Sequence, residues 1–205
     1  AKVNLQSAGK QTACALLLLK GANRREGPFM EITFVRHGQT EWNSLGKQQG
    51  KEDIPLNSRG IEQAKQTAQL LADRQFDRVY CSPLQRAKQT AQIICENRQI
   101  PIFYEPRIAE RDMGEFQGKR WDEFDTRAFW DYAANHHYQQ AENIRDFYDR
   151  VYNFLDELKG KPGRALLVSH GGVFAPVSSY AGRSKKEDNL IDNLLENAQA
   201  FTFVI

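Results

Sequence analysis

The sequence predicts an α/β fold: a three-layer α/β/α sandwich around a mostly parallel central sheet. Short segments rich in apolar, β-branched and aromatic residues alternate along the chain with longer segments of helical periodicity. The segment 165–168 is continuously apolar, which is typical of a strand buried on both faces of a parallel sheet.

Five strands are expected, each bounded by glycine, proline or polar residues. They lie at 31–35, 76–82, 102–104, 165–168 and 199–205. Because helical segments separate most of them, the strands are expected to pair in parallel with helices on both faces of the sheet.

Apolar residues three and four positions apart predict the helices. They are expected at 61–74, from Pro83 to about residue 98, at 142–159, and from about residue 172 towards Tyr180. Ser58 is the expected N-cap of the first helix, and Pro83 suits the first turn of the second. The aromatic and polar segment 121–138 is expected to be helical with a loop.

The composition excludes several classes of protein. The 205 residues are 40% hydrophobic and 26% charged with a net charge of +2, so neither a nucleic-acid partner nor a membrane surface is expected. Three cysteines without paired spacing do not form a disulfide framework, and Cys81 and Cys95 are expected to be buried and reduced. The four histidines lack the spacing of a zinc site. A cytoplasmic location is expected, and a homodimer is left open.

The first 29 residues differ from the rest. They are basic, contain no acidic residue before Glu26, and include one apolar run at 13–19, whereas Met30 opens the first strand directly. The prediction is an N-terminal extension at 1–29, added upstream, followed by one domain at 30–205. A targeting peptide is the alternative, although the apolar run is at the short limit for a signal sequence.

Two predicted strands end in a histidine followed by glycine. The first ends in Arg36-His37-Gly38, and the fourth ends in Ser169-His170-Gly171-Gly172. Arg86 follows the second strand by about one helical turn. If these strands are parallel neighbours, their carboxyl ends share one crevice in which the two histidines and two arginines converge. Singly, each has an ordinary explanation as a hydrogen-bonded histidine or a solvated arginine.

Phosphoryl transfer is the chemistry that suits such a crevice. Arginine supplies bidentate donors and positive charge to a phosphate, and a neutral imidazole can act as the nucleophile. No P-loop pattern is present, and no Asp-rich cluster indicates metal chemistry. A carboxylic acid must protonate the leaving alkoxide, and position alone leaves Glu110, Asp112 and Glu115 open.

Five ordered segments resemble the histidine phosphatase superfamily, also called phosphoglycerate-mutase-like, in its small phosphatase branch. The first is the Arg-His-Gly-Gln-Thr-Glu-Trp-Asn run at 36–43, and the others are 56–64, 82–91, 110–118 and 169–172. The resemblance covers essentially 30–205.

The resemblance implies a role for each matching residue. His37 is the phosphorylated nucleophile, Glu110 is the proton donor, and Arg36, Arg86 and His170 complete the phosphate pocket. The remaining implied contacts to phosphate or substrate are Asn43, Gln49, Gly50 and the backbone amide of Gly171. No metal ion or other cofactor is implied.

Two segments depart from the family or leave its pattern open. Many small phosphatases of the superfamily carry Gly-Glu-Ser before the long amphipathic helix, where this chain has Gln-Ala-Glu-Asn at 140–143. The aromatic segment 119–141 either sets specificity or is core beneath a lid.

The expected function is that of a metal-independent phosphomonoesterase acting on a small phosphorylated metabolite through a phosphohistidine. The chain lacks the Arg-His-Tyr-Gly of the mutase-type acid loop and has Arg-Asp-Met-Gly at 111–114, which favours hydrolysis. A phosphoglycerate-mutase-type transfer is the alternative, and a non-catalytic phosphate-binding module is a further one.

Overall fold

The computed structural model describes residues 28–205, which form one five-stranded sheet in the order β3-β2-β4-β1-β5. The strands are β1 (Met30–Arg36), β2 (Arg78–Cys81), β3 (Ile102–Tyr104), β4 (Gly163–Ser169) and β5 (Ala200–Val204). All neighbours are parallel except β5, which runs antiparallel to β1. All five predicted strands are therefore present, and the sheet is mostly parallel as expected.

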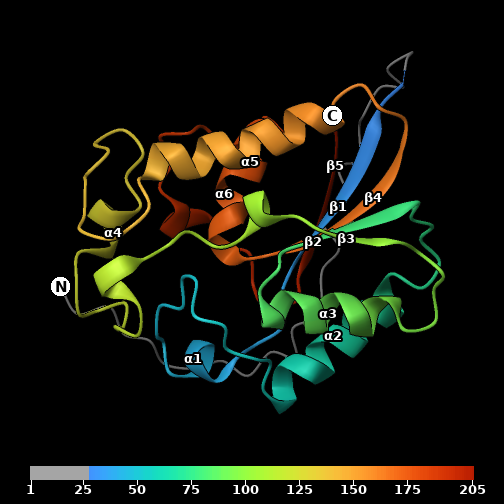
Figure 1. Cartoon of the computed structure of the whole chain (residues 1–205), viewed down its shortest axis with the longest axis horizontal. Coiled ribbons are helices and arrows are strands. Elements are labelled where there is room, and N and C mark those ends of the chain that lie inside the picture. Colours follow the sequence, from blue (N-terminus) through green and yellow to red (C-terminus); the bar gives the residue numbers. More distant parts are fainter. Residues whose placement is uncertain (1–27) are drawn as a thin grey trace.

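The helices cover both faces of this sheet. They are α1 (Glu41–Ser44), α2 (Ser58–Leu70), α3 (Gln85–Cys95), α4 (Thr126–Phe129), α5 (Ile144–Leu158) and α6 (Gly171–Tyr180), with short 3₁₀ turns at Pro106–Ile108, Gly114–Phe116 and Leu190–Asn193. Figure 1 shows α2 and α3 on one side of the strands and α5 and α6 on the other. The three-layer α/β/α arrangement predicted from the sequence is confirmed.

The apolar strand β4 contributes to a separate core on each face of the sheet. Ala165 and Leu167 belong to the cluster beneath α5 and α6, whereas Leu166 and Val168 belong to the cluster beneath α2 and α3. All four side chains are fully buried. Burial on both faces explains why this strand is continuously apolar instead of alternating.

The N-terminal extension expected before the sheet stays a prediction. Residues 1–27, which include Cys14 and the apolar run at 13–19, lie outside the described residues, so the proposed extension at 1–29 is not tested. Cys81 and Cys95 are buried free thiols, as expected, and burial raises the pKa of Cys81 to about 12.

The predicted cap of α2 was wrong by one residue. Asn57 is the N-cap, since its side-chain oxygen accepts a hydrogen bond from the backbone N–H of Gly60 at 2.9 Å, and Ser58 is the first helical residue. Asn57 also donates to the Gln39 side chain, which joins the start of α2 to the loop after β1. This second contact is tertiary and has no local sequence signal.

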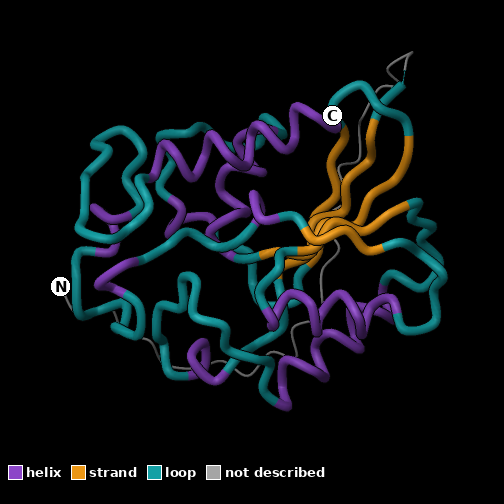
Figure 2. The backbone as a smooth tube through the Cα atoms, in the orientation of Figure 1, coloured by secondary structure: helices purple, strands orange, loops and turns teal. Residues whose placement is uncertain are grey.

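The segment 121–138 forms much less helix than expected. Among its residues only Thr126–Phe129 are α-helical, and the rest are turns and irregular backbone (Figure 2). Its aromatic rings pack around Phe116, which stacks on Phe124 at 4.5 Å and meets Phe129 and Tyr138 edge-on. Contacts with one central ring, rather than a helical stripe, determine the path of this segment.

The loop after β1 passes very close to the start of α2, and two glycines make this possible. A Cβ atom on Gly38 would lie 2.3 Å from the carbonyl oxygen of Gly60, and one on Gly60 would lie 2.0 Å from the carbonyl oxygen of Gln39. Both obstacles are backbone atoms, which cannot rotate aside. The close approach holds the loop containing His37 against the helix.

Gly60→Ala is therefore expected to lower the free energy of unfolding by about 3 kcal/mol or more, because backbone must move to admit the methyl group. Gly160→Ala is the matched control, since its φ of +74° is strained but nothing lies within 4 Å of the new Cβ. Its cost is about 1 kcal/mol. Urea unfolding measures both values, and equal losses would contradict the close-approach explanation.

Candidate active site

The register between β1 and β4 brings the two predicted histidines together. Arg36 lies opposite Ser169 in the parallel pair, so His37 and His170 leave the sheet side by side. Their ring centroids are 5.2 Å apart, and the two residues are 2% and 0% exposed. The convergence expected from the strand ends is present in the structure.

A cavity of about 220 Å³ opens at these strand ends. All predicted site residues except His170 line it: Arg36, His37, Asn43, Gln49, Gly50, Arg86, Glu110 and Gly171. His170 is fully buried beside the His37 ring. Residues of four of the five sequence segments thus line one site, and the fifth, 56–64, packs against the loop after β1.

Hydrogen bonding defines which nitrogen of His37 is reactive. Its Nδ1 lies 2.7 Å from the carbonyl oxygen of Gly38, which can only accept, so Nδ1 carries the proton and Nε2 keeps its lone pair. Burial, with further contributions from Arg86 and Arg36, holds the pKa of His37 well below its usual value of 6.5. The ring is therefore neutral at neutral pH, with the lone pair on Nε2.

His170 is oriented by Ser82, a residue at the end of β2 to which sequence reasoning assigned no role. The Ser82 Oγ lies 2.7 Å from Nε2 of His170 and also accepts from the backbone N–H of Leu84 at 3.3 Å. We assign the Ser82 hydroxyl as the donor to Nε2, which leaves the His170 proton on Nδ1. That atom is buried and has no partner among the described residues. Burial is the main cause that lowers the pKa of His170 well below 6.5.

The two arginines of the cavity, Arg86 (fully buried) and Arg36 (half-buried), are held by backbone carbonyls and not by carboxylates. Arg36 Nη1 donates to the Leu195 carbonyl at 2.6 Å, and Arg86 donates to the carbonyls of Glu52 and Gly50 at 2.7 and 2.8 Å. Neither makes an ion pair within 4.0 Å in the described part of the chain, and the Nε of each has no partner there.

Both guanidiniums nevertheless remain charged at neutral pH. Burial lowers the pKa of Arg36, and it lowers that of Arg86 to about 10. Two cations without paired anions favour a dianionic ligand between them.

Of the three acidic candidates, only Glu110 lines the cavity. Its carboxylate accepts from the backbone N–H groups of Arg111 at 3.0 Å and Gly172 at 3.1 Å. Asp112 instead pairs with Lys51, and the exposed Glu115 with Lys119. Glu110 is thus the one of the three candidates that the structure places in the cavity.

Glycine is required at position 172 for this contact. A Cβ there would lie 2.2 Å from Oε1 of Glu110 and 2.8 Å from the Trp130 ring. The start of α6 therefore approaches the carboxylate as closely as a backbone can.

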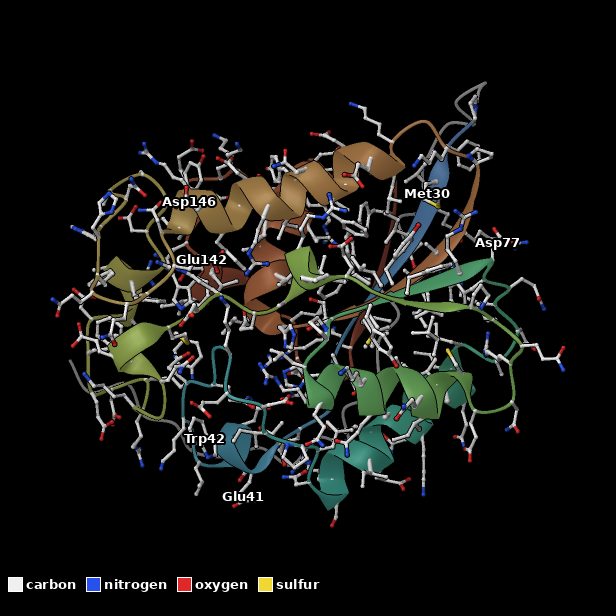
Figure 3. The ribbon with its side chains drawn as sticks, in the orientation of Figure 1. Met30, Glu41, Trp42, Asp77, Glu142 and Asp146 are labelled. Atoms are coloured by element: carbon white, nitrogen blue, oxygen red, sulfur yellow. The ribbon has the colours of Figure 1, made fainter. Side chains whose placement is uncertain are left out.

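The loop that carries Glu110 is held by hydrogen bonds from Arg150 on α5. Arg150 donates to both oxygens of Glu142, at 2.6 and 2.9 Å, and to the backbone carbonyl of Glu110 at 3.1 Å. Glu142, at the N-terminal end of α5 in Figure 3, also accepts from the backbone N–H of Asp112 at 3.2 Å. Asn143 caps α5 in place of the family's serine. The departure at 140–143 thus retains a glutamate that fixes the acid loop.

The loop after β1 supplies the remaining polar side chains. Asn43 Oδ1 accepts from the backbone and side chain of Thr40, both at 3.1 Å, and from Asn197 at 3.3 Å. Gln49 accepts from Thr40 at 2.9 Å, and the carbonyl of Gly50 holds Arg86. With these oxygens occupied, the amide nitrogens of the two side chains are the groups available to a ligand.

Sequence reasoning missed several cavity residues. Besides Ser82, which orients His170, they are Lys47, Gln48, Met113, Leu190, Leu194 and Asn197. Trp121 and Trp130 also line the cavity, and both belong to the segment 119–141 whose role in specificity the sequence leaves open. Asn197 donates to the backbone carbonyl of His37 at 3.1 Å, although the two lie far apart in the chain. Loop residues of this kind carry no periodic signal, and only their proximity to a motif could have drawn attention to Lys47 and Gln48.

Neither a metal-binding cluster nor a membrane-spanning helix is found among the described residues. No group of three or more histidine, cysteine, aspartate or glutamate side chains is placed there to hold a metal ion. No helix among them is long and apolar enough to cross a membrane.

Comparison with known proteins decides the family. The sequence model of the histidine phosphatase superfamily (branch 1) matches residues 32–199. The chain belongs to the histidine phosphatase superfamily. The family predicted from the motifs is confirmed.

Curated relatives include phosphatases and mutase-like proteins. Phosphoserine phosphatase 1 of Hydrogenobacter thermophilus is 34% identical over 149 residues, covering 69% of this chain and 71% of the relative. Phosphatase PhoE of Bacillus subtilis, described as uncharacterized, is 38% identical over 144 residues, covering 69% and 72%. Phosphoglycerate mutase-like protein 4 of Arabidopsis thaliana is 32% identical over 180 residues, covering 82% and 78%.

Solved structures of the superfamily share the fold. Mycobacterial hydrolase 1 matches with a TM-score of 0.75 at 25% identity, covering 86% of this chain and 92% of that one. A mycobacterial glucosyl-3-phosphoglycerate phosphatase matches with a TM-score of 0.73 at 26% identity, covering 86% and 90%. These matches confirm the predicted fold and an enzyme of the phosphatase class, with mutase-like members among its relatives.

The state of the two buried histidines is directly measurable. We expect ¹⁵N spectra at pH 6.5 to show both imidazoles neutral, with the His37 proton on Nδ1, because burial and the arginines disfavour the charged ring. A His37→Asn variant assigns the signals. A doubly protonated His37 at this pH would contradict the assignment.

The lowered pKa values of His37 and His170 also make the free energy of unfolding depend on pH. The unfolded histidines take up protons near pH 6.5 while the folded ones stay neutral, so the free energy of unfolding is expected to fall as the pH decreases below 6.5.

Proposed function

We propose that the chain hydrolyses a small phosphorylated metabolite through a phosphohistidine on His37, without a metal ion. One observation carries the proposal: the lone pair of a neutral, buried imidazole lies in a cavity with two unpaired guanidiniums and a carboxyl group. Each is a part that phosphoryl transfer to a histidine requires.

In the first step, Nε2 of His37 attacks phosphorus and the bond from phosphorus to the ester oxygen breaks. Glu110, protonated at this stage, gives its proton to the departing oxygen, so the product leaves as an alcohol. Arg36, Arg86 and the Nδ1–H of His170 stabilise the charge on the three equatorial oxygens.

In the second step, water attacks the phosphorus of the phosphohistidine. The Glu110 carboxylate takes a proton from that water, the bond from phosphorus to nitrogen breaks, and the electron pair returns to Nε2 of His37. Phosphate leaves, and Glu110 is again the protonated acid.

The size of the cavity supports a small substrate. Its volume of about 220 Å³ must hold the phosphoryl group and the start of the leaving group, which suits a metabolite better than a protein. A cytoplasmic location and a homodimer stay predictions.

The role of Glu110 is tested by Glu110→Gln. On an alkyl phosphate such as glycerol 1-phosphate we expect kcat/KM to fall about 10²- to 10⁴-fold, because an alkoxide leaves poorly without a proton. On p-nitrophenyl phosphate the loss should be smaller, since p-nitrophenolate is a stable leaving group. Steady-state kinetics on both substrates measure the difference.

Glu115→Gln is the matched control, because Glu115 lies on the same loop but is exposed and outside the cavity. It should behave as the wild type. Equal losses on the two substrates in Glu110→Gln would exclude Glu110 as the acid.

The nucleophile is tested by trapping. Brief incubation with ³²P-labelled phosphoester and acid-sensitive, base-stable recovery of the label on protein should identify phosphohistidine, and His37→Ala should lose both label and turnover. Label in the mutant would refute the mechanism.

The same trapping assays separate the two other functions. Binding of phosphate without label or turnover would support a non-catalytic module. Label that transfers to a second phosphoglycerate, needs bisphosphoglycerate priming and releases no phosphate would support a mutase.

A further inference from the structure

One cation in the cavity, besides Arg36 and Arg86, has no carboxylate partner among the described residues. Lys47 lines the cavity and makes no ion pair within 4.0 Å in the described part of the chain. Its nearest recorded partner is the ring of Trp42, whose centroid lies 5.7 Å from Nζ. That distance is near the limit for a cation–π contact, which leaves the charge of the ammonium uncompensated.

Three neighbouring cations on the loop after β1 and on the segment before α4 are each paired with an acid. Lys51 pairs with Asp112 at 3.3 Å, Lys119 with Glu115 at 3.9 Å, and Arg120 with Asp122 at 3.1 Å. All three lie outside the cavity lining. Among these four side chains, Lys47 alone lines the cavity, and it alone has no carboxylate partner among the described residues.

The cavity lining also has more cationic than acidic side chains. Its lining contains three cationic side chains, Arg36, Arg86 and Lys47, and one acid, Glu110. In the proposed mechanism Glu110 serves as the proton donor, and a phosphate dianion balances the guanidiniums of Arg36 and Arg86. The charge of Lys47 remains.

We infer that the substrate carries a second anionic group on its leaving side, and that Lys47 binds it. The class is a small phosphomonoester with a carboxylate on its alcohol portion. This inference rests on the proposed function, because it places the phosphoryl group at His37.

The walls beside Lys47 favour such a contact. Trp121 and Leu194 line the same cavity, and such partly exposed apolar side chains lower the local dielectric and strengthen an ion pair. Lys47 is half-buried, so its stem is held while its ammonium stays reachable. A second carboxylate of the protein is absent from the lining, so the ligand must supply it.

The test uses binding of inert phosphonates, which does not depend on turnover. We expect 3-phosphonopropionate to bind the wild type about tenfold more tightly than propylphosphonate, which lacks only the carboxylate. The preference should fall to about one in Lys47→Met, which keeps the apolar stem over Trp42. It should also shrink as salt is raised, because the pair is partly exposed.

Lys119→Met is the matched control, since it removes an equally near lysine that is paired and outside the cavity. It should keep the preference for the carboxylate. Equal wild-type affinities for the two phosphonates, or a preference that survives in Lys47→Met, would overturn the inference.

Kinetics on phosphate esters distinguish this inference from the proposed function. Turnover of p-nitrophenyl phosphate together with equal phosphonate affinities would refute the role of Lys47 alone. A carboxylate preference without turnover of any phosphoester would refute hydrolysis and retain the binding site. In the expected case, 3-phosphoglycerate exceeds glycerol 1-phosphate in kcat/KM about tenfold, and Lys47→Met removes the difference.

Discussion

The pairing of β1 with β4 is the constraint on which the site depends. Seven consecutive residues of each strand are in parallel register, with Arg36 opposite Ser169 at the end. A slip of one residue would turn every buried side chain to the opposite face of the sheet. Because helices cover both faces, the two cores hold the register, and His37 and His170 are placed together as a consequence of packing.

Stability and function compete at the ends of these strands. Burying the Arg86 guanidinium without an anion costs several kcal/mol, and the half-buried Arg36 adds less; their bonds to backbone carbonyls only partly offset this cost. The rest of the domain must supply that stability, through a two-sided core and the close approach of Gly38 to Gly60. In the proposed mechanism a bound phosphate supplies the missing charge, and the donors that receive it are already in place.

Most of the fold could be predicted from sequence, because strands and long helices have periodic patterns. The convergence of Arg36, His37, Arg86 and His170 at the cavity could also be predicted, since they lie in short motifs at or just after strand ends. The cap at Asn57 and the helix content of 121–138 could not. Both depend on tertiary contacts: Asn57 with Gln39, and aromatic rings with Phe116. Ser82 and Asn197 act through partners far away in the chain.

The two halves of the cavity differ in how well they can be predicted, because only one of them is built from strand ends. The phosphate end is made of strand termini and the start of α6, so its geometry is as rigid as the sheet and its residues are legible in sequence. The leaving-group end comes from loops after β1, before α5 and before β5, which meet only after folding. Chemistry can therefore be shared across a family while the charge and shape that select a substrate vary. In the role inferred for Lys47, one unpaired cation in the cavity is enough to decide which leaving group is favoured.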